Sequence, residues 1–172
     1  LAALSRATAA AAAGASGSVR MVGDSLTVGS LPFQRAAFQR MGFGDVAVDA
    51  HVSRAVRSKA PDDPRTGLQA VDWIRSTAGD ADFWVMALGT NDAVTTAESG
   101  YEAVIETMTD RIGAGRLVMW VDIFLPTHPG VQQAWNAALD AVAGRRPGQV
   151  VVHRWSQTAA TRPGWLGVDH IH

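Results

Sequence analysis

The sequence predicts one α/β domain in which a five-stranded parallel sheet lies between two layers of helices, a three-layer α/β/α sandwich. Short apolar runs alternate with amphipathic, helix-like runs along most of the chain. The run at residues 82–88 is apolar on both faces, which is typical of an interior strand of a parallel sheet. Small polar motifs follow the first three predicted strands, and parallel sheets place their functional sites at such strand ends.

The composition indicates a folded protein and gives no sign of a strongly charged binding partner. The chain has 172 residues, of which 47% are hydrophobic and 18% charged, enough for one domain with a core. The formal net charge of -1 gives no basic excess for nucleic acid or an anionic membrane surface. Without cysteine, disulfides and thiolate metal sites are excluded, and we expect neither cofactor nor metal. No run is long enough for a membrane span, and a monomer is expected.

The chain opens with a segment unlike the rest. Residues 1–17 are rich in Ala, Gly and Ser, and we interpret them as a tail or linker before a domain at residues 18–172. A signal-peptide remnant and a linker from a preceding domain both fit this composition. An alanine-rich helix on the domain surface fits it equally well. We expect an exported, extracytoplasmic protein.

The first half of the chain alternates as the fold requires. A strand at residues 18–22 leads into Gly23-Asp24-Ser25-Leu26, and a helix-like stretch follows to residue 41, where glycines end it. A short strand at residues 46–50 precedes a polar loop at residues 51–66, in which two prolines break regular structure.

The second half repeats the alternation with clearer helices. Its strands are predicted at residues 82–88, 116–121 and 150–152. Apolar residues at helical spacing mark the helices, namely Leu68, Val71, Trp73 and Ile74, then Tyr101, Val104, Ile105 and Met108, then residues 132–142. Four tryptophans on these elements are expected in the core: Trp73, Trp84, Trp120 and Trp135.

Ser25 is the candidate nucleophile. A strand, a tight turn, a serine and a helix together lift a hydroxyl above the sheet edge, where the helix start favours developing negative charge. Such a serine needs a base and an oxyanion site. Gly89-Thr90-Asn91-Asp92 follows the third predicted strand, and Asp169-His170-Ile171-His172 ends the chain. Alone, each motif also fits a helix cap or a polar turn, but their order and placement favour a catalytic site.

Together these motifs resemble the four blocks of the SGNH hydrolase superfamily, also called the GDSL esterases and lipases. The resemblance spans residues 19–172 and implies a flavodoxin-like fold. It implies that Ser25 is the nucleophile, His172 the base, Asp169 the residue that orients His172, and Asn91 an oxyanion donor. His170 is a rival base, and a metal site at His170 and His172 carries little weight.

The second block departs from the family pattern. The family has a glycine after the second strand, whose backbone N–H completes the oxyanion hole. Here Ser53 occupies that position, so the oxyanion hole would consist of the N–H groups of Ser25 and Ser53 and the side chain of Asn91. Arg54 beside it is a candidate contact for an anionic or sugar substrate, with a solvated arginine as the alternative. Trp165 is a candidate to stack on a sugar ring, with loop packing as the alternative.

Three functions follow from this resemblance. The first is a serine esterase that hydrolyses small, acetyl-type esters, with a glycan or small-molecule ester as substrate. The second is an O-acyltransferase that moves the acyl group onto a glycan with the same triad. It is suggested by similarity to the SGNH domains of polysaccharide and peptidoglycan O-acetyltransferases, carried by the Gly23-Asp24-Ser25-Leu26 block, the altered second block and residues 152–155. The third is an inactive SGNH-like module that binds glycans.

Overall fold

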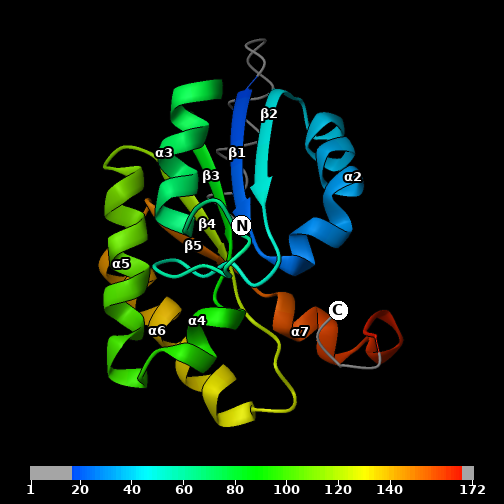
Figure 1. Cartoon of the computed structure of the whole chain (residues 1–172), viewed down its shortest axis with the longest axis vertical. Helices are drawn as coiled ribbons and strands as arrows, with labels where there is room; N and C mark the ends of the chain where they lie inside the picture. Colours follow the sequence, from blue (N-terminus) through cyan, green and yellow to red (C-terminus); the bar gives the residue numbers. More distant parts are fainter. Residues whose placement is uncertain (1–16, 168–172) are drawn as a thin grey trace.

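The computed structural model describes residues 17–167, and five of its strands form one parallel sheet in the order β2-β1-β3-β4-β5 (Figure 1). The strands are β1 (Gly17–Gly23), β2 (Phe43–Ala50), β3 (Phe83–Ala87), β4 (Leu117–Val121) and β5 (Val150–His153). The predicted five-stranded parallel sheet is therefore confirmed. β1 is a central strand, because it pairs with both β2 and β3.

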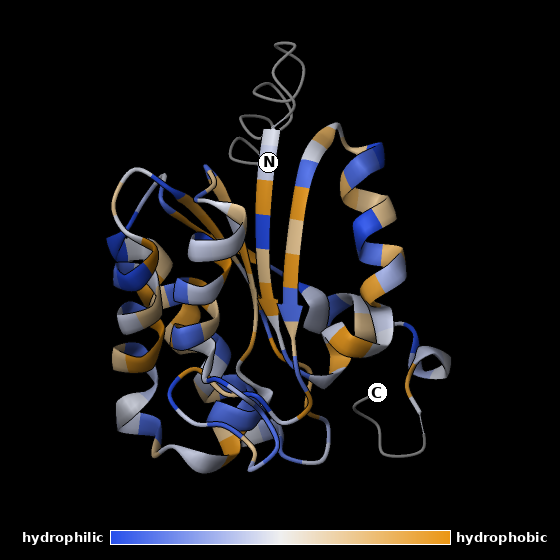
Figure 2. Cartoon of the chain, turned by 45° about the horizontal axis from the view of Figure 1, so that its top comes forward, coloured by the Kyte–Doolittle hydropathy of each residue, from blue (hydrophilic) through white to orange (hydrophobic). Residues whose placement is uncertain are grey.

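Helices cover both faces of this sheet, as predicted. The helices are α2 (Ser25–Arg40), α3 (Gly67–Ala78), α4 (Thr90–Thr95), α5 (Tyr101–Ile112), α6 (Pro129–Arg145) and α7 (Trp155–Ala160), with short 3₁₀ turns η1 (Glu98–Gly100) and η2 (Pro163–Trp165). α2 packs against β1 and β2 on one face, while α3, α5 and α6 lie on the other (Figure 1). Figure 2 shows hydrophobic residues concentrated in the strands between these layers.

The larger core lies between the sheet and α3, α5 and α6. Trp84, Trp120 and Trp135 are fully buried in it, which confirms three of the four predicted core tryptophans. Trp73 was wrongly expected there, since 43% of it is exposed. The buried face of α3 is formed by smaller residues on its other side, and the guanidinium of Arg65 lies 4.3 Å from the Trp73 ring centroid.

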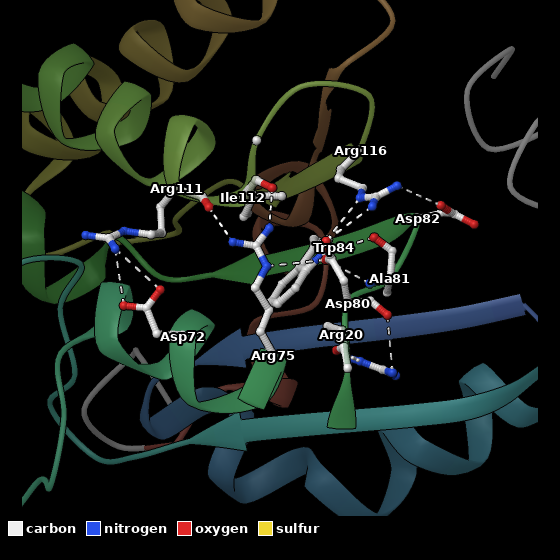
Figure 3. A network of polar contacts seen from close by, with 12 residues as sticks. Arg20, Asp72, Arg75, Asp80, Ala81, Asp82, Trp84, Arg111, Ile112 and Arg116 are labelled. Atoms are coloured by element: carbon white, nitrogen blue, oxygen red, sulfur yellow. Dashed lines mark hydrogen bonds and ion pairs between the residues drawn. The ribbon is translucent and has the colours of Figure 1, made fainter. Parts of the chain in front are cut away.

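A polar network fastens the sheet at the amino ends of its strands (Figure 3). Arg20 is buried in β1, and its guanidinium donates to the carbonyl of Gly79 at 3.0 Å and to the carboxylate of Asp45 at 2.7 Å. Asp80, at the start of the turn into β3, accepts from Trp84 Nε1 at 3.2 Å and from Arg116 at 3.2 Å. This network lies at the opposite end of β1 from Ser25, so it holds the sheet without entering the candidate site.

Candidate active site

The turn after β1 places Ser25 at the first position of α2. Asp24 is the N-cap, and its carboxylate accepts from the backbone N–H of Leu26 at 3.1 Å. The backbone N–H of Asp24 donates to Ala87 at the end of β3 at 3.2 Å. A Cβ at Gly23 would lie 1.9 Å from Thr27 Oγ1, so only glycine allows this close approach. Ser25 is therefore half-buried at a helix start that favours negative charge.

Ser53 adopts a left-handed backbone conformation in the loop after β2. Its φ is 59°, and in the part of the chain that the structure describes no other non-glycine residue has a positive φ. This is the region that glycine adopts most readily. The backbone N–H of His51 donates to Gly23 at 3.2 Å, and that of Arg54 donates to His51 at 3.3 Å. The loop is thus fastened to the end of β1, and the serine keeps a glycine-like backbone.

Asn91 joins the loop after β3 to the loop after β2. It is the second residue of α4, and its Nδ2 donates to the backbone carbonyl of Arg54 at 3.0 Å. An amide NH₂ carries two hydrogens, so this bond orients Asn91 and uses one of them. A Cβ at Gly89, the N-cap residue of α4, would lie 2.6 Å from the Trp135 ring. Glycine there lets α4 start directly against the core.

The structure corrects the expectation for Arg54. Its side chain is fully buried, with 0% exposure, and is neither solvated nor available to a substrate. Its Nε and Nη2 donate to the two carboxylate oxygens of Asp63 at 2.9 and 3.0 Å, and its Nη1 donates to the carbonyl of Asp49 at 3.1 Å. Burial disfavours the charge on Asp63, but hydrogen bonds from Arg54 and Arg65 outweigh it and lower the pKa of Asp63. Its two acidic partners, Asp49 in β2 and Asp63 near the end of the loop, are far enough apart in the sequence that no local pattern revealed this pairing.

Asp92, the last residue of the Gly89-Thr90-Asn91-Asp92 motif, has a structural role. Its carboxylate is buried and accepts from the backbone N–H of Val56 at 3.0 and 3.1 Å. Burial raises the pKa of Asp92 to about 7, against the hydrogen bond from Val56, and the neighbouring carboxylate of Asp24 raises it further. Asp92 therefore holds the loop after β2 from a second side.

A cleft of about 400 Å³ opens beside the start of α2. It is lined by one face of α2, by the ends of β1, β3, β4 and β5, and by α7 and η2. The rings of Trp155 and Trp165 stack at 6.5 Å with an angle of 15° between their planes, and Trp165 is 59% exposed. Trp165 thus lies in the cleft, and its contact with a sugar stays a prediction. Trp155 begins the short helix α7.

Asp122 also lines this cleft, but both of its carboxylate oxygens accept hydrogen bonds from within the protein. Its carboxylate is buried and accepts from the backbone N–H and the hydroxyl of Ser156 at 2.6 Å each. It therefore fixes the start of α7 and is not placed to bind a substrate.

The last predicted block lies outside the described residues. Asp169 and His172 follow the described part of the chain, so their roles as orienting residue and base stay predictions, as does that of His170. Within residues 17–167 no group of three His, Asp or Glu side chains is arranged to hold a metal ion. No helix in that range is both long and apolar enough to cross a membrane.

Solved structures share this architecture at low sequence identity. The chain is similar to the C-terminal catalytic domain of Streptococcus pneumoniae peptidoglycan O-acetyltransferase A (OatA) with a methylsulfonyl adduct, at 16% identity and a TM-score of 0.69, over 91% of this chain and 80% of that one. TesA aligns at 18% identity and a TM-score of 0.71, over 90% and 88% of the two chains. The chain has the SGNH hydrolase fold.

A third structure with this fold is a psychrotrophic esterase, EstA from Pseudoalteromonas sp., inhibited by monoethylphosphonate. It aligns at 10% identity and a TM-score of 0.67, over 91% of this chain and 87% of that chain. No protein-family model and no curated protein matches the chain. On the SGNH hydrolase fold of this chain, the first three blocks fall at the carboxyl ends of β1, β2 and β3, at Ser25, Ser53 and Asn91.

Proposed function

We propose that this protein is a serine esterase that cleaves small, acetyl-type esters of carbohydrates through an acyl-serine intermediate. The observation that carries the proposal is the meeting of three loops at one edge of the sheet. Ser25 begins α2, Ser53 has the backbone of a glycine, and Asn91 is bonded to the residue after Ser53. These residues supply one nucleophile and three candidate oxyanion donors, namely the N–H groups of Ser25 and Ser53 and the Asn91 side chain, which acyl transfer requires.

In the proposed reaction, the Ser25 hydroxyl attacks the ester carbonyl while His172 takes its proton, and Asp169 holds the imidazole in the required tautomer. The oxyanion that forms accepts hydrogen bonds from the N–H groups of Ser25 and Ser53 and from Asn91 Nδ2. Collapse of this intermediate breaks the bond to the alcohol, which leaves with the proton from His172. Water then attacks the acyl-serine while His172 takes its proton, and collapse of the second intermediate releases acetate and returns this proton to Ser25 Oγ.

The end of the described chain supports this assignment of the base. Trp165 and Leu166 line the same cleft as Asp24 and Leu26. Asp169 and His172 follow Leu166 within a few residues, and an extended residue spans at most about 3.6 Å. His172 is six residues beyond Leu166, a reach of up to about 20 Å, and Leu166 borders the same cleft as the two neighbours of Ser25, which supports His172 as the base.

The carbohydrate part of the proposal is supported by the cleft and by one neighbour. The stacked Trp155 and Trp165 border the cleft, and exposed aromatic rings are common surfaces for sugars. The structure of OatA belongs to a peptidoglycan O-acetyltransferase. A glycan substrate also fits the exported location that we propose for this protein.

The likeness to OatA favours a second candidate, an O-acyltransferase. The first half of the reaction would be the same, and a sugar hydroxyl would replace water as the acceptor of the acyl group. Both candidates use the same residues, so only the products distinguish them.

The test is hydrolysis of p-nitrophenyl acetate and butyrate by the wild type and by Ser25→Ala, with and without a chito-oligosaccharide acceptor. We expect the wild type to release nitrophenol and the variant to lose almost all of this activity. An acylated sugar detected by mass spectrometry would favour the transferase. Equal rates for the two proteins would exclude Ser25 as the nucleophile. An inactive wild type in which a serine-directed phosphonate does not label Ser25 would favour a binding module.

A further inference from the structure

A buried ion pair braces the long loop between β2 and α3. Arg54 lies near the start of this loop and Asp63 near its end, with exposures of 0% and 1%. Two parallel hydrogen bonds, of 2.9 and 3.0 Å, join the guanidinium to the carboxylate. This bidentate geometry is the most directional that a charged pair can form. The loop contains neither helix nor strand, so this pair is a principal constraint on its shape.

A second carboxylate ties the pair to the sheet. Asp49 is the second-last residue of β2. Its backbone carbonyl accepts a hydrogen bond from Nη1 of Arg54 at 3.1 Å, and its carboxylate lies 3.2 Å from the same nitrogen. The other carboxylate oxygen of Asp49 lies 2.9 Å from Arg65, at the far end of the loop. Arg54 is therefore fixed relative to both the strand before the loop and the residues before α3.

The backbone of the same arginine is connected to two of the three candidate oxyanion donors, the Ser53 N–H and the Asn91 amide. Arg54 directly follows Ser53 and shares a peptide unit with it, and its own N–H bonds to His51, so the position of Arg54 constrains the turn that carries the Ser53 N–H. The carbonyl of Arg54 accepts Nδ2 of Asn91 at 3.0 Å. One residue thus connects the backbone donor after β2 with the side-chain donor after β3.

We propose that the buried Arg54–Asp63 pair is a positioning device that sets the Ser53 N–H and the Asn91 amide relative to each other for oxyanion binding. This inference rests on the proposed esterase or acyltransferase reaction. A buried ion pair is a poor source of net stability, because desolvation offsets most of the attraction. Its strict geometry is more useful for holding donors, since a displacement of about 1 Å at a catalytic site costs about 100-fold in rate.

The main test replaces both charges at once, with Arg54→Met and Asp63→Leu in one protein. Removing both partners avoids an unpaired buried charge, so the fold should survive. We expect kcat for p-nitrophenyl acetate to fall at least about 10-fold with KM changed less than about threefold, because the oxyanion forms only after substrate binds. Melting temperature and circular dichroism report the fold. The matched control is Arg57→Met, an exposed arginine of the same loop whose side chain bonds to α5, and it should keep the wild-type kcat.

Two further measurements keep the proposal open to refutation. Asp63→Asn retains the shape of the side chain without its charge, and it replaces the double variant if that protein does not fold. In ¹⁵N NMR spectra the Ser53 amide and the Asn91 side-chain amide should shift in the folded variants and not in Arg57→Met. A folded variant with wild-type kcat, or with unmoved signals for both donors, would overturn the positioning role. If the wild type shows no Ser25-dependent hydrolysis, the proposed reaction fails, while the NMR measurement still decides the geometric claim.

Discussion

The left-handed backbone conformation of Ser53 is unfavourable for a non-glycine residue and is held by its neighbours. A non-glycine residue in the left-handed region is disfavoured by about 1–2 kcal/mol, because its Cβ approaches the backbone carbonyl. Ser53 stays at φ 59° because the bonds of His51 and Arg54 on either side hold the turn. Under the proposed function, this conformation aims its N–H at the oxyanion.

Substitutions at Ser53 should separate backbone conformation from side-chain chemistry. Ser53→Gly removes the conformational cost but raises the entropy of the unfolded chain, so we expect stability within about 1 kcal/mol of wild type and retained kcat. Ser53→Val places a branched residue at positive φ, and we expect a loss of about 1–2 kcal/mol together with a fall in kcat. Urea unfolding and p-nitrophenyl acetate kinetics measure both. A valine variant that matches the wild type in both would contradict this account.

Individual residues also show what can and cannot be predicted from the sequence. The positions of Ser25, Ser53 and Asn91 after three successive strands were predicted from motifs, and the structure places them at those strand ends. The burial of Arg54 was missed, because its partner Asp49 lies in β2 and its partner Asp63 lies nine residues further on in an irregular loop, so no periodic pattern links them. Pairing across such a loop depends on the tertiary fold, which local pattern does not encode.

At the scale of elements, length decided which predictions succeeded. The five strands and the helices α3, α5 and α6 have enough apolar residues to show a period, and all were predicted within a few residues of their ends. α4 and α7 have six residues each, which is less than two helical turns, and neither was predicted. α2 begins at Ser25, earlier than expected, because the side chain of Asp24 caps it.

Two glycines of the β1–α2 unit should respond oppositely to alanine. At Gly23 a Cβ would lie 1.9 Å from Thr27 Oγ1, whereas at Gly29, inside α2, it would meet nothing within 4 Å. We expect Gly23→Ala to displace the turn at Ser25, with a loss of stability of about 1–3 kcal/mol and of most esterase activity. Gly29→Ala should gain about 0.5–1 kcal/mol by helix propensity and keep its activity. Thermal melts and ester hydrolysis on the pair measure this contrast, and a harmless Gly23→Ala would refute it.

On the scale of the whole molecule, the two ends of the sheet have different electrostatics. At the amino ends of the strands, Arg20 meets Asp45, and Arg116 meets Asp80 (Figure 3). At the carboxyl ends, the buried carboxylate of Asp92 has Asp24 as a like-charged neighbour and Arg57 as its favourable charge. Both ends therefore contain ion pairs, since Arg54 pairs with Asp63 at the carboxyl end, but the carboxyl end also holds Asp92, an ionisable group whose charge is disfavoured.

This asymmetry predicts a pH-dependent stability. The pKa of Asp92 is raised from 3.8 to about 7 in the folded protein, so between these values the folded state binds a proton that the unfolded state has lost. The stabilisation is complete below pH 3.8 and is lost as pH rises through about 7. Each pKa unit corresponds to about 1.4 kcal/mol, so the contribution is of the order of a few kcal/mol.

Asp92→Asn isolates this contribution, because asparagine can accept from Val56 but cannot ionise. Relative to wild type, we expect the variant to gain stability in urea unfolding as pH rises from 3.8 to about 7, and to gain no more above that pH, because only in this window does folded wild type bind a proton that the unfolded chain has lost. Ser76→Ala, on the exposed surface of α3, serves as a control with an unchanged slope. Parallel pH profiles for wild type and Asp92→Asn would show that Asp92 titrates normally.

The left-handed serine after β2 also bears on how distant relatives of this protein are recognised. A sequence pattern that demands glycine at this turn rejects any chain that keeps the shape with another residue. A pattern written in dihedral angles, with one left-handed position between two strand-end motifs, accepts both. Chains whose sequences diverged while this backbone conformation was preserved would then be grouped together. The second block would be defined by its backbone conformation and not by the identity of one residue.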